Sequence, residues 1–160
     1  MIFGGPYQQD AQEFISFLLE NLHDETNRLR DRTGEVQQPA LNPRSTALSN
    51  ALLYWNEYRK YNDSLVDKYW RGVEVTDRRC RSCGHPSLTY EHFDAIHLPI
   101  PPNAATTATT MADLLAQYCG ADLLPEYKCD QCQRIDTTEK RVRLVRLPDL
   151  LCVPQRGFRV

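Results

Sequence analysis

The sequence predicts an α+β fold in which helices and strands occupy separate parts of the chain. Up to about residue 70, apolar residues recur at the three- and four-residue spacing of amphipathic helices. From Val73 onward they alternate with a period of two, and two Cys-x-x-Cys pairs fall within this second part. Together these observations predict a helical region followed by a long β region that carries a metal site.

The composition describes one ordinary globular domain. The chain has 160 residues, of which 41% are hydrophobic and 25% charged, and no apolar run approaches the roughly 20 residues that cross a bilayer. The formal net charge of −2 argues against a general nucleic-acid binder. Residues 134–159 are richer in basic side chains, for which a solvated strand face is the simpler explanation and a nucleic-acid patch the alternative.

The chain opens with MIFGGPYQQD, which contains no apolar signal segment. We therefore expect an intracellular protein, cytoplasmic or nuclear, with reduced cysteines and no membrane partner.

The strongest helix signal covers residues 8–30. Asp10 and Glu13, three residues apart, predict a capping box at its start. The expected buried face consists of Ala11, Phe14, Ile15, Leu18, Leu19 and Leu22.

A second helix is expected from Ser45, as its N-cap, to about Tyr61. Residues 64–70 are expected to add one further helical turn. The apolar stripe of the second helix consists of Leu48, Ala51, Leu52, Trp55 and Tyr58. We interpret its two aromatic residues as core and not as a binding platform.

The first half of the β region contains one expected irregularity. Alternation runs through Val73 and Val75 towards the first cysteine pair, and out again from Leu88 to Ile100. Phe93 breaks the phase of this alternation, which predicts a β-bulge.

The second half begins with residues 101–110 (PPNAATTATT), which we expect to form a mobile surface loop. A short helix is predicted over 111–118. Residues 137–147 are predicted to return as a strand, and Leu150 to Val153 to form a buried strand.

Cys80, Cys83, Cys129 and Cys132 indicate one structural zinc ion per chain. Each pair puts two thiolates on a tight turn, and two such turns complete a tetrahedral four-sulfur site. The long interval between the pairs means that the turns belong to separate hairpins that meet in space. A redox-active pair would explain only one of the two motifs, and a reducing compartment disfavours disulfides. The remaining Cys119 and Cys152 lie in apolar runs and are expected to be core residues.

Several segments, in this order, resemble the ubiquitin-specific protease family of cysteine deubiquitinases. Residues 8–14 (QQDAQEF) and the following Leu18-Leu19 and Leu22-His23 look like the family's QQDAxEF…LLxxLH signature. Trp55, Ser64-x-Val66 and Trp70-x-Gly72 are similar to its W…S-x-I/V-x-x-x-F-x-G segment, with Trp in place of Phe. The two cysteine pairs follow in the family's order, as do Ser87-x-Thr89-x-x-x-Phe93, Thr138-x-Lys140 and Leu147-Pro148-x-Leu150.

The resemblance implies a fragment of the papain-like, hand-shaped catalytic domain of that family. Residues from about 8 to 70 would form part of the helical thumb, and about 71–148 the zinc-tipped fingers with the short helix at 111–118. Residues 149–160 would be a truncated palm strand. The fingers hold the globular body of ubiquitin, so ubiquitin or a ubiquitinated protein is the expected partner.

The same resemblance implies thiol-dependent hydrolysis of the bond after the C-terminal glycine of ubiquitin. Asp10 and Glu13 would then bind the Arg-rich tail of ubiquitin through charge-assisted hydrogen bonds, with helix capping as the alternative role.

The catalytic residues of the family are not found between Met1 and Val160. The family's nucleophile lies in a Gly-Asn-x-Cys segment ahead of the QQDA helix, and its histidine base in a Gly-His-Tyr segment beyond the LP-x-x-L strand. We therefore assign no catalytic residue and expect no hydrolysis by this chain alone. Pro154 and Gly157 also depart from the family's last strand, and a mis-spliced or truncated gene model would explain both this departure and the missing histidine segment.

Two alternative functions remain open. One is a catalytically dead, zinc-stabilised ubiquitin-binding or scaffold module. The other is a free-standing zinc-ribbon nucleic-acid binder, which would explain the cysteines but not the QQDAQEF helix.

Overall fold

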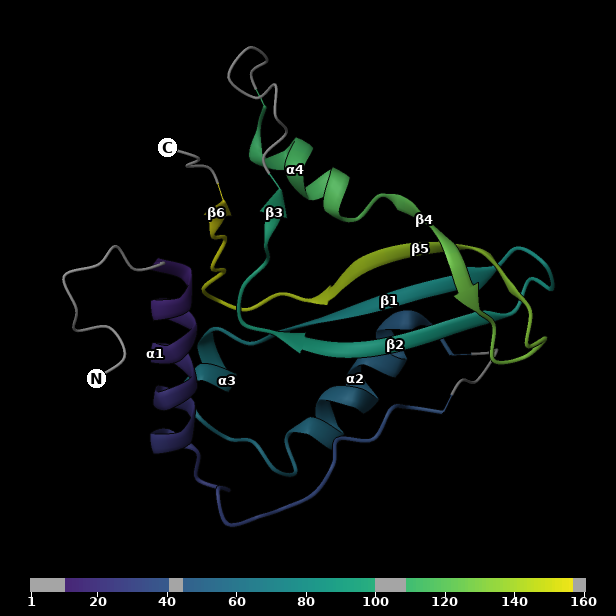
Figure 1. The fold of residues 1–160 in the computed structure, drawn as a ribbon. Helices are drawn as coiled ribbons and strands as arrows, with labels where there is room; N and C mark the ends of the chain where they lie inside the picture. Colours follow the sequence, from purple (N-terminus) through teal and green to yellow (C-terminus); the bar gives the residue numbers. More distant parts are fainter. Residues whose placement is uncertain (1–10, 41–44, 100–108, 157–160) are drawn as a thin grey trace.

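The computed structural model of this protein describes residues 11–40, 45–99 and 109–156. Its first helices and strands are α1 (Ala11–Thr26), α2 (Ala47–Tyr58), α3 (Leu65–Tyr69), β1 (Gly72–Cys80) and β2 (Pro86–Phe93). They are followed by β3 (Leu98–Pro99), α4 (Met111–Tyr118), β4 (Ala121–Lys128), β5 (Ile135–Arg146) and β6 (Gln155–Arg156) (Figure 1). This order confirms the α+β class. None of the described helices is long and apolar enough to cross a membrane.

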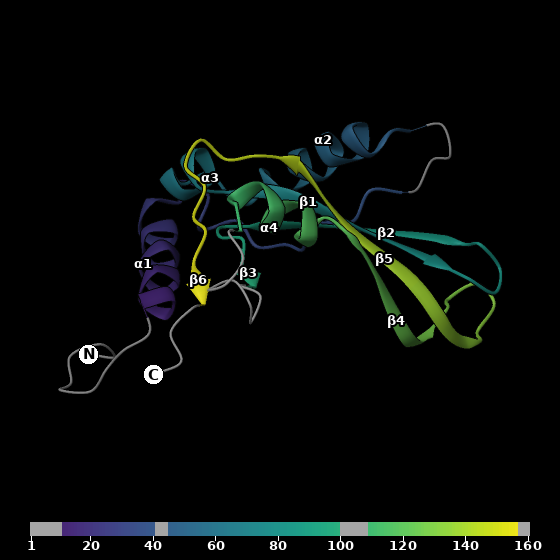
Figure 2. The ribbon, with the colours of Figure 1, turned by 90° about the horizontal axis from the view of Figure 1, so that it is seen from above.

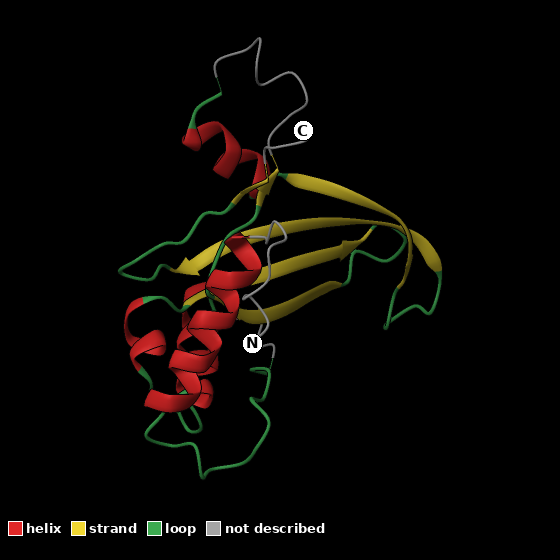
Figure 3. Cartoon of the chain, turned by 60° about the vertical axis from the view of Figure 1, so that its left-hand side comes forward, coloured by secondary structure: helices red, strands yellow, loops and turns green. Residues whose placement is uncertain are grey.

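The four long strands form one antiparallel sheet in the order β2-β1-β5-β4, and β3 and β6 form a separate parallel pair. The sheet extends as a curved arm away from α1 and α3 (Figure 2). Three helices gather at one end of the strands, and α4 lies apart from them (Figure 3). The long sheet therefore has a helical base and a free tip.

The expected β-bulge at Phe93 is wrong. β2 keeps a continuous register with β1 from Pro86 to Phe93, and the chain then bends at Asp94 before β3 begins. The break in alternation therefore marks the end of a strand. The register shifts lie elsewhere, between Val73 and Glu74 against β5 and between Leu124 and Tyr127 of β4. The second shift includes Pro125, which has no backbone N–H to donate.

Two apolar clusters hold the sheet to the helices. On one face, Ala51 and Tyr54 of α2 pack against three buried residues of β1 and β2, namely Val73, Val75 and Tyr90. On the other face, Leu114 of α4 packs with Ile96 and Leu98, and Phe93 and Leu144 join this cluster. The base of the sheet is thus covered on both sides.

The buried face predicted for α1 is largely wrong. Leu19 is buried, but Phe14 is 46% exposed and Leu18 is 52% exposed. The helix packs mainly against α3, which is five residues long and covers little of the stripe. The helical periodicity predicted the helix itself correctly, because periodicity does not report how much of a stripe a neighbour covers.

The predicted cap and stripe of α2 also need correction. Thr46, and not Ser45, caps the helix, and its side chain accepts a hydrogen bond from the backbone N–H of Ser49. Leu48 and Leu52 are 59% and 58% exposed, whereas the buried positions are Asn50, Ala51, Tyr54 and Tyr58. The helix is rotated because Tyr54 packs against Tyr90 of the sheet, with 6.2 Å between the ring centroids.

The C-terminal part differs from expectation in two places. Leu150 and Leu151 are exposed, and only Cys152 of the predicted buried strand makes an isolated bridge, to Ala95. The edge strand β4 was not predicted, because its side chains are mostly exposed and show no clear alternation. The low-complexity segment lies almost entirely outside the described residues, as does Gly157, whereas the predicted further turn (α3) and the short helix α4 are confirmed.

A buried polar network built on Asp67 joins the helices to the sheet. The Tyr58 hydroxyl donates to Asp67 Oδ1 at 2.6 Å, and the backbone N–H of Ser64 donates to Asp67 Oδ2 at 2.7 Å. Arg71 Nη1 lies 3.5 Å from Asp67 Oδ1, and His23 Nδ1 lies 3.3 Å from Asp67 Oδ2. Burial alone would raise the pKa of Asp67, but these hydrogen bonds and the Arg71 charge outweigh it and hold the pKa below its usual value.

We expect Asp67→Asn to lower the free energy of unfolding at pH 7 by about 3 kcal/mol, because it leaves Arg71 without one of its buried partners. A depressed pKa in the folded state stabilises the protein above the unfolded-state pKa, and this contribution is lost as the pH falls through the folded-state value. The deficit of the variant should therefore shrink below about pH 4. Urea unfolding at pH 7, 5 and 3.5 measures this, with the exposed Asp31→Asn as the control. A deficit that is independent of pH would contradict the role of the Asp67 charge.

Candidate functional site

The four paired cysteines meet at the free tip of the sheet. Their Sγ atoms all lie within 4.8 Å of one another, with Cys80 and Cys132 3.9 Å apart and Cys83 and Cys129 3.7 Å apart. A tetrahedral site with Zn–S bonds of about 2.3 Å has sulfur–sulfur edges of about 3.8 Å. The cluster can hold one metal ion, and the two separate hairpins meet as predicted.

The two cysteine turns have the same backbone geometry. The residue after each pair has a positive φ, 72° at Gly84 and 58° at Gln133. The N–H of each of these residues donates to the carbonyl of the first cysteine of its pair, at 2.8 Å in both turns. These turns point backbone N–H groups at sulfur, and the N–H of Cys132 makes the largest contribution to lowering the pKa of the Cys129 thiol to about 7. Despite a backbone hydrogen bond, burial and the neighbouring thiols instead raise the pKa of Cys83 to about 12. Thiolate is the form that binds a metal.

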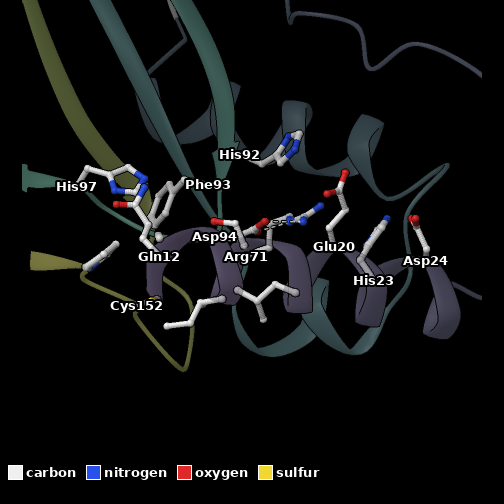
Figure 4. Close-up of a pocket in the computed structure, with 15 residues that line it drawn as sticks. Gln12, Glu20, His23, Asp24, Arg71, His92, Phe93, Asp94, His97 and Cys152 are labelled. Atoms are coloured by element: carbon white, nitrogen blue, oxygen red, sulfur yellow. Dashed lines mark hydrogen bonds and ion pairs between the residues drawn. The ribbon is translucent and has the colours of Figure 1, made fainter. Parts of the chain in front are cut away.

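A cleft of about 490 Å³ lies at the other end of the sheet, between α1 and the chain that follows β2. Helix α1 contributes Gln12, Glu20, His23 and Asp24 to its lining (Figure 4). Asp94 of the bend after β2 lies opposite and accepts two hydrogen bonds from Arg71, at 2.5 and 2.8 Å. This ion pair neutralises the charge of Asp94. The acidic wall of the cleft is therefore α1, which carries the carboxylates of Glu20 and Asp24.

One of the two predicted contacts to the ubiquitin tail, Glu13, lies near this cleft. Glu13 is exposed in the first turn of α1, one residue after Gln12 of the lining, and Asp10 lies outside the described residues. The structure does not bring Glu13 together with the four cysteines, which lie at the opposite end of the sheet (Figure 1).

The two remaining cysteines lie apart from the cluster. Cys119 is the C-cap of α4 and is half-buried. Cys152 is half-buried as well, and it lines the cleft together with His97. In the parts of the chain that the structure describes, no cysteine side chain is hydrogen-bonded to a histidine ring.

Sequence reasoning did not identify Arg71, Asp94 or the cleft role of His23. His23 stands in the Leu22-His23 pair of the family-like signature, and its Nδ1 lies 2.9 Å from Ser64 Oγ at the cap of α3. Arg71 and Asp94 flank strand ends that are paired with each other, Gly72 with Phe93. The sequence holds no local signal for this ion pair, because Arg71 and Asp94 are brought together only by the pairing of β1 with β2.

Comparison with known proteins identifies a family and several relatives that are much longer than this chain. A model of the family described as ubiquitin carboxyl-terminal hydrolase matches residues 3–159. The rat protein ubiquitin carboxyl-terminal hydrolase 21 is 31% identical over 98% of this chain and 31% of its own length. Ubiquitin carboxyl-terminal hydrolase 4 of Saccharomyces cerevisiae is 27% identical over 98% of this chain and 18% of its own length. The chain thus spans less than a third of these relatives.

Solved structures show a similar fold. The SAGA DUB module of Ubp8, Sgf11, Sus1 and Sgf73 bound to monoubiquitin matches 93% of this chain and 27% of the compared chain, with a TM-score of 0.60 and 18% identity. Since the family model covers nearly every residue and the fold agrees, the chain belongs to the ubiquitin carboxyl-terminal hydrolase family.

Proposed function

We propose that this chain is the ubiquitin-holding part of a thiol-dependent deubiquitinase that cleaves the bond after the C-terminal glycine of ubiquitin. One observation carries the proposal, a long sheet with a four-sulfur cluster at its tip and an acidic cleft at its base, in a chain of this family. In this proposal residues from about 8 to 70 serve as part of a thumb, about 71–148 as metal-tipped fingers, and 149–160 as part of a palm.

The curvature of the sheet supports a globular partner. The outer end of the sheet bends towards the side to which β6 and the first turn of α1 also point (Figure 2). This side is opposite α2, because α2 packs against Val75 and Tyr90 on the other face. By their register Thr76, Thr138 and Val142 face this side, and all three side chains are buried. We place the body of ubiquitin against this concave face.

The acidic wall of α1 suits the basic tail of ubiquitin. Glu13, Glu20 and Asp24 are exposed along the helix that forms one side of the cleft. Arginine side chains can bind such carboxylates through paired, charge-assisted hydrogen bonds. We propose that Asp10 and Glu13 contact the tail.

We further propose that this chain alone binds ubiquitin without cleaving it, since four of its six cysteines are committed to the metal cluster. Incubation with a ubiquitin–fluorophore substrate tests this directly. Turnover that disappears in Cys119→Ser or Cys152→Ser would contradict it. A catalytically dead binding module is the second candidate, and a longer transcript that encodes the Gly-Asn-x-Cys and Gly-His-Tyr segments would exclude it.

We expect Glu13→Lys to weaken ubiquitin binding about tenfold, because it replaces a charge-assisted contact with a like-charge repulsion. Titration of labelled ubiquitin with the chain measures the affinity. The matched control is Glu25→Lys, which makes the same charge change in the last turn of α1 and should leave the affinity within about twofold. Equal losses in the two variants would indicate a general charge effect and count against a contact at Glu13.

We propose that zinc is the metal and expect one zinc ion per purified chain. Cys83→Ser and Cys129→Ser should each lose it and destabilise residues 73–145, because structural zinc sites contribute apparent binding energies of about 10 kcal/mol or more. The matched controls Cys119→Ser and Cys152→Ser should retain a full equivalent. Metal analysis combined with circular dichroism checks both results. Less than half an equivalent of zinc in the unmodified protein would contradict the proposal.

A further inference from the structure

A second cleft, of about 580 Å³, opens where the ends of α1, α2 and β5 meet α3. It shares no lining residue with the acidic cleft described above. We propose that this second cleft, here called the basic cleft, binds a phosphoryl group carried by a peptide. Its lining consists of Thr26, Arg28, Trp55, Arg59, Asp63, Ser64, Leu65, Asp67, Lys68 and Arg146.

The cations of the basic cleft outnumber the carboxylates free to pair with them. Asp67 is occupied by the buried network, and Asp63 Oδ2 pairs with Arg28 Nη2 at 2.7 Å. In the described parts of the chain, no carboxylate lies within ion-pair distance of Arg59, Lys68 or Arg146. Asp149 acts on Lys68 and Arg146 only through longer-range attraction. An excess of positive charge therefore gathers here in a chain of net charge −2.

The guanidinium of Arg146 is held in place by two contacts within the protein. It stacks on the Trp55 ring, with 3.9 Å from its Cζ to the ring centroid, and its Nη1 donates to the carbonyl of Arg71. Stacking fixes the plane of the group and leaves Nε and Nη2 available. A fixed guanidinium fork matches two oxygens of a phosphate, and less side-chain freedom is then lost on binding.

The charges of Arg59 and Arg146 interact. Burial lowers the pKa of Arg146, the attraction of Asp149 opposes this effect, and the positive charge of Arg59 lowers the pKa further. An anion bound by both cations would remove the repulsion between them.

Charge and size together select the ligand. A phosphate monoester carries a charge of about −1.5 to −2 and three acceptor oxygens, enough for Arg59, Lys68 and Arg146 together, whereas a carboxylate carries one charge. A cleft of about 580 Å³ is far larger than a phosphate ion. Leu65, 47% exposed, offers an apolar contact to residues beside the phosphate. A phosphorylated peptide therefore fits better than a free anion.

The test uses the complete 160-residue chain and a pool of short fluorescent peptides with one central phosphoserine, followed by fluorescence anisotropy. We expect the double variant Arg59→Gln/Lys68→Gln to weaken binding at least about tenfold, because two charge-assisted contacts are lost. The matched control Arg79→Gln/Lys128→Gln removes two exposed cations from the sheet and should stay within about twofold. Equal weakening by the control would overturn the site.

A second variant tests the geometry apart from the charge. Arg146→Lys keeps the positive charge but loses the stacked fork, so we expect at least about fivefold weaker binding with an unchanged metal content and circular dichroism spectrum. Wild-type binding of the unphosphorylated pool with equal affinity would overturn the proposal. So would inorganic phosphate that binds as tightly as the phosphopeptides, because that result assigns the cleft to a free ion. Ubiquitin affinity should be unchanged by the double variant, so failure here is distinguishable from failure of the proposed function.

Discussion

The relative positions of the first three helices and β1 depend on the hydrogen bonds and charges that stabilise the buried carboxylate of Asp67. Asp67 is 5% exposed, and a charge removed from water to this degree destabilises the fold unless hydrogen bonds and opposite charge surround it. Its partners come from four places in the chain, namely His23 of α1, Tyr58 of α2, Ser64 at the cap of α3 and Arg71 just before β1. Because all of these groups must converge on one side chain, the three helices have little freedom relative to the first strand.

Arg71 links the Asp67 network at the helical base to the acidic cleft and to β1, the strand that leads to the cysteine cluster. Its guanidinium donates to Asp94, which fixes the bend between β2 and β3 and thereby one wall of the acidic cleft. The next residue, Gly72, starts β1, where a Cβ atom would lie 2.2 Å from the ring of Phe93. Only glycine allows the two strand ends to approach this closely, and β1 then runs without a break to Cys80. The cleft and the metal cluster are therefore held by the two ends of the same strand.

The sequence predicted the features that depend on local chemistry and missed those that depend on which surfaces meet. Two Cys-x-x-Cys pairs suffice to locate the cluster, because metal binding requires the four sulfurs whatever the surrounding fold. The helices α3 and α4 were predicted, and Ser64 and Thr110 cap them through hydrogen bonds to residues three positions away, whereas the cap of α2 was predicted one residue too early. The stripe of α2 could not be found from local chemistry, because its rotation is set by contact with Tyr90, far along the chain. Likewise, no local pattern pairs Arg71 with Asp94.

The family-like segments have a structural meaning that the resemblance alone did not show. His23, Ser64 and Gly72 each belong to such a segment, and in the structure all three serve the junction between helices and sheet and contact no sulfur of the cluster. A sheet tip that is closed by its own four cysteines can be rigid by itself, but rigidity at the tip does not set the distance to the cleft. That distance is determined where the sheet leaves the helices, at Asp67, Arg71 and Gly72. For a partner that touches both the concave face and the cleft, the spacing between the two is therefore determined by Asp67 and Gly72 outside the cleft and by Arg71 in its lining.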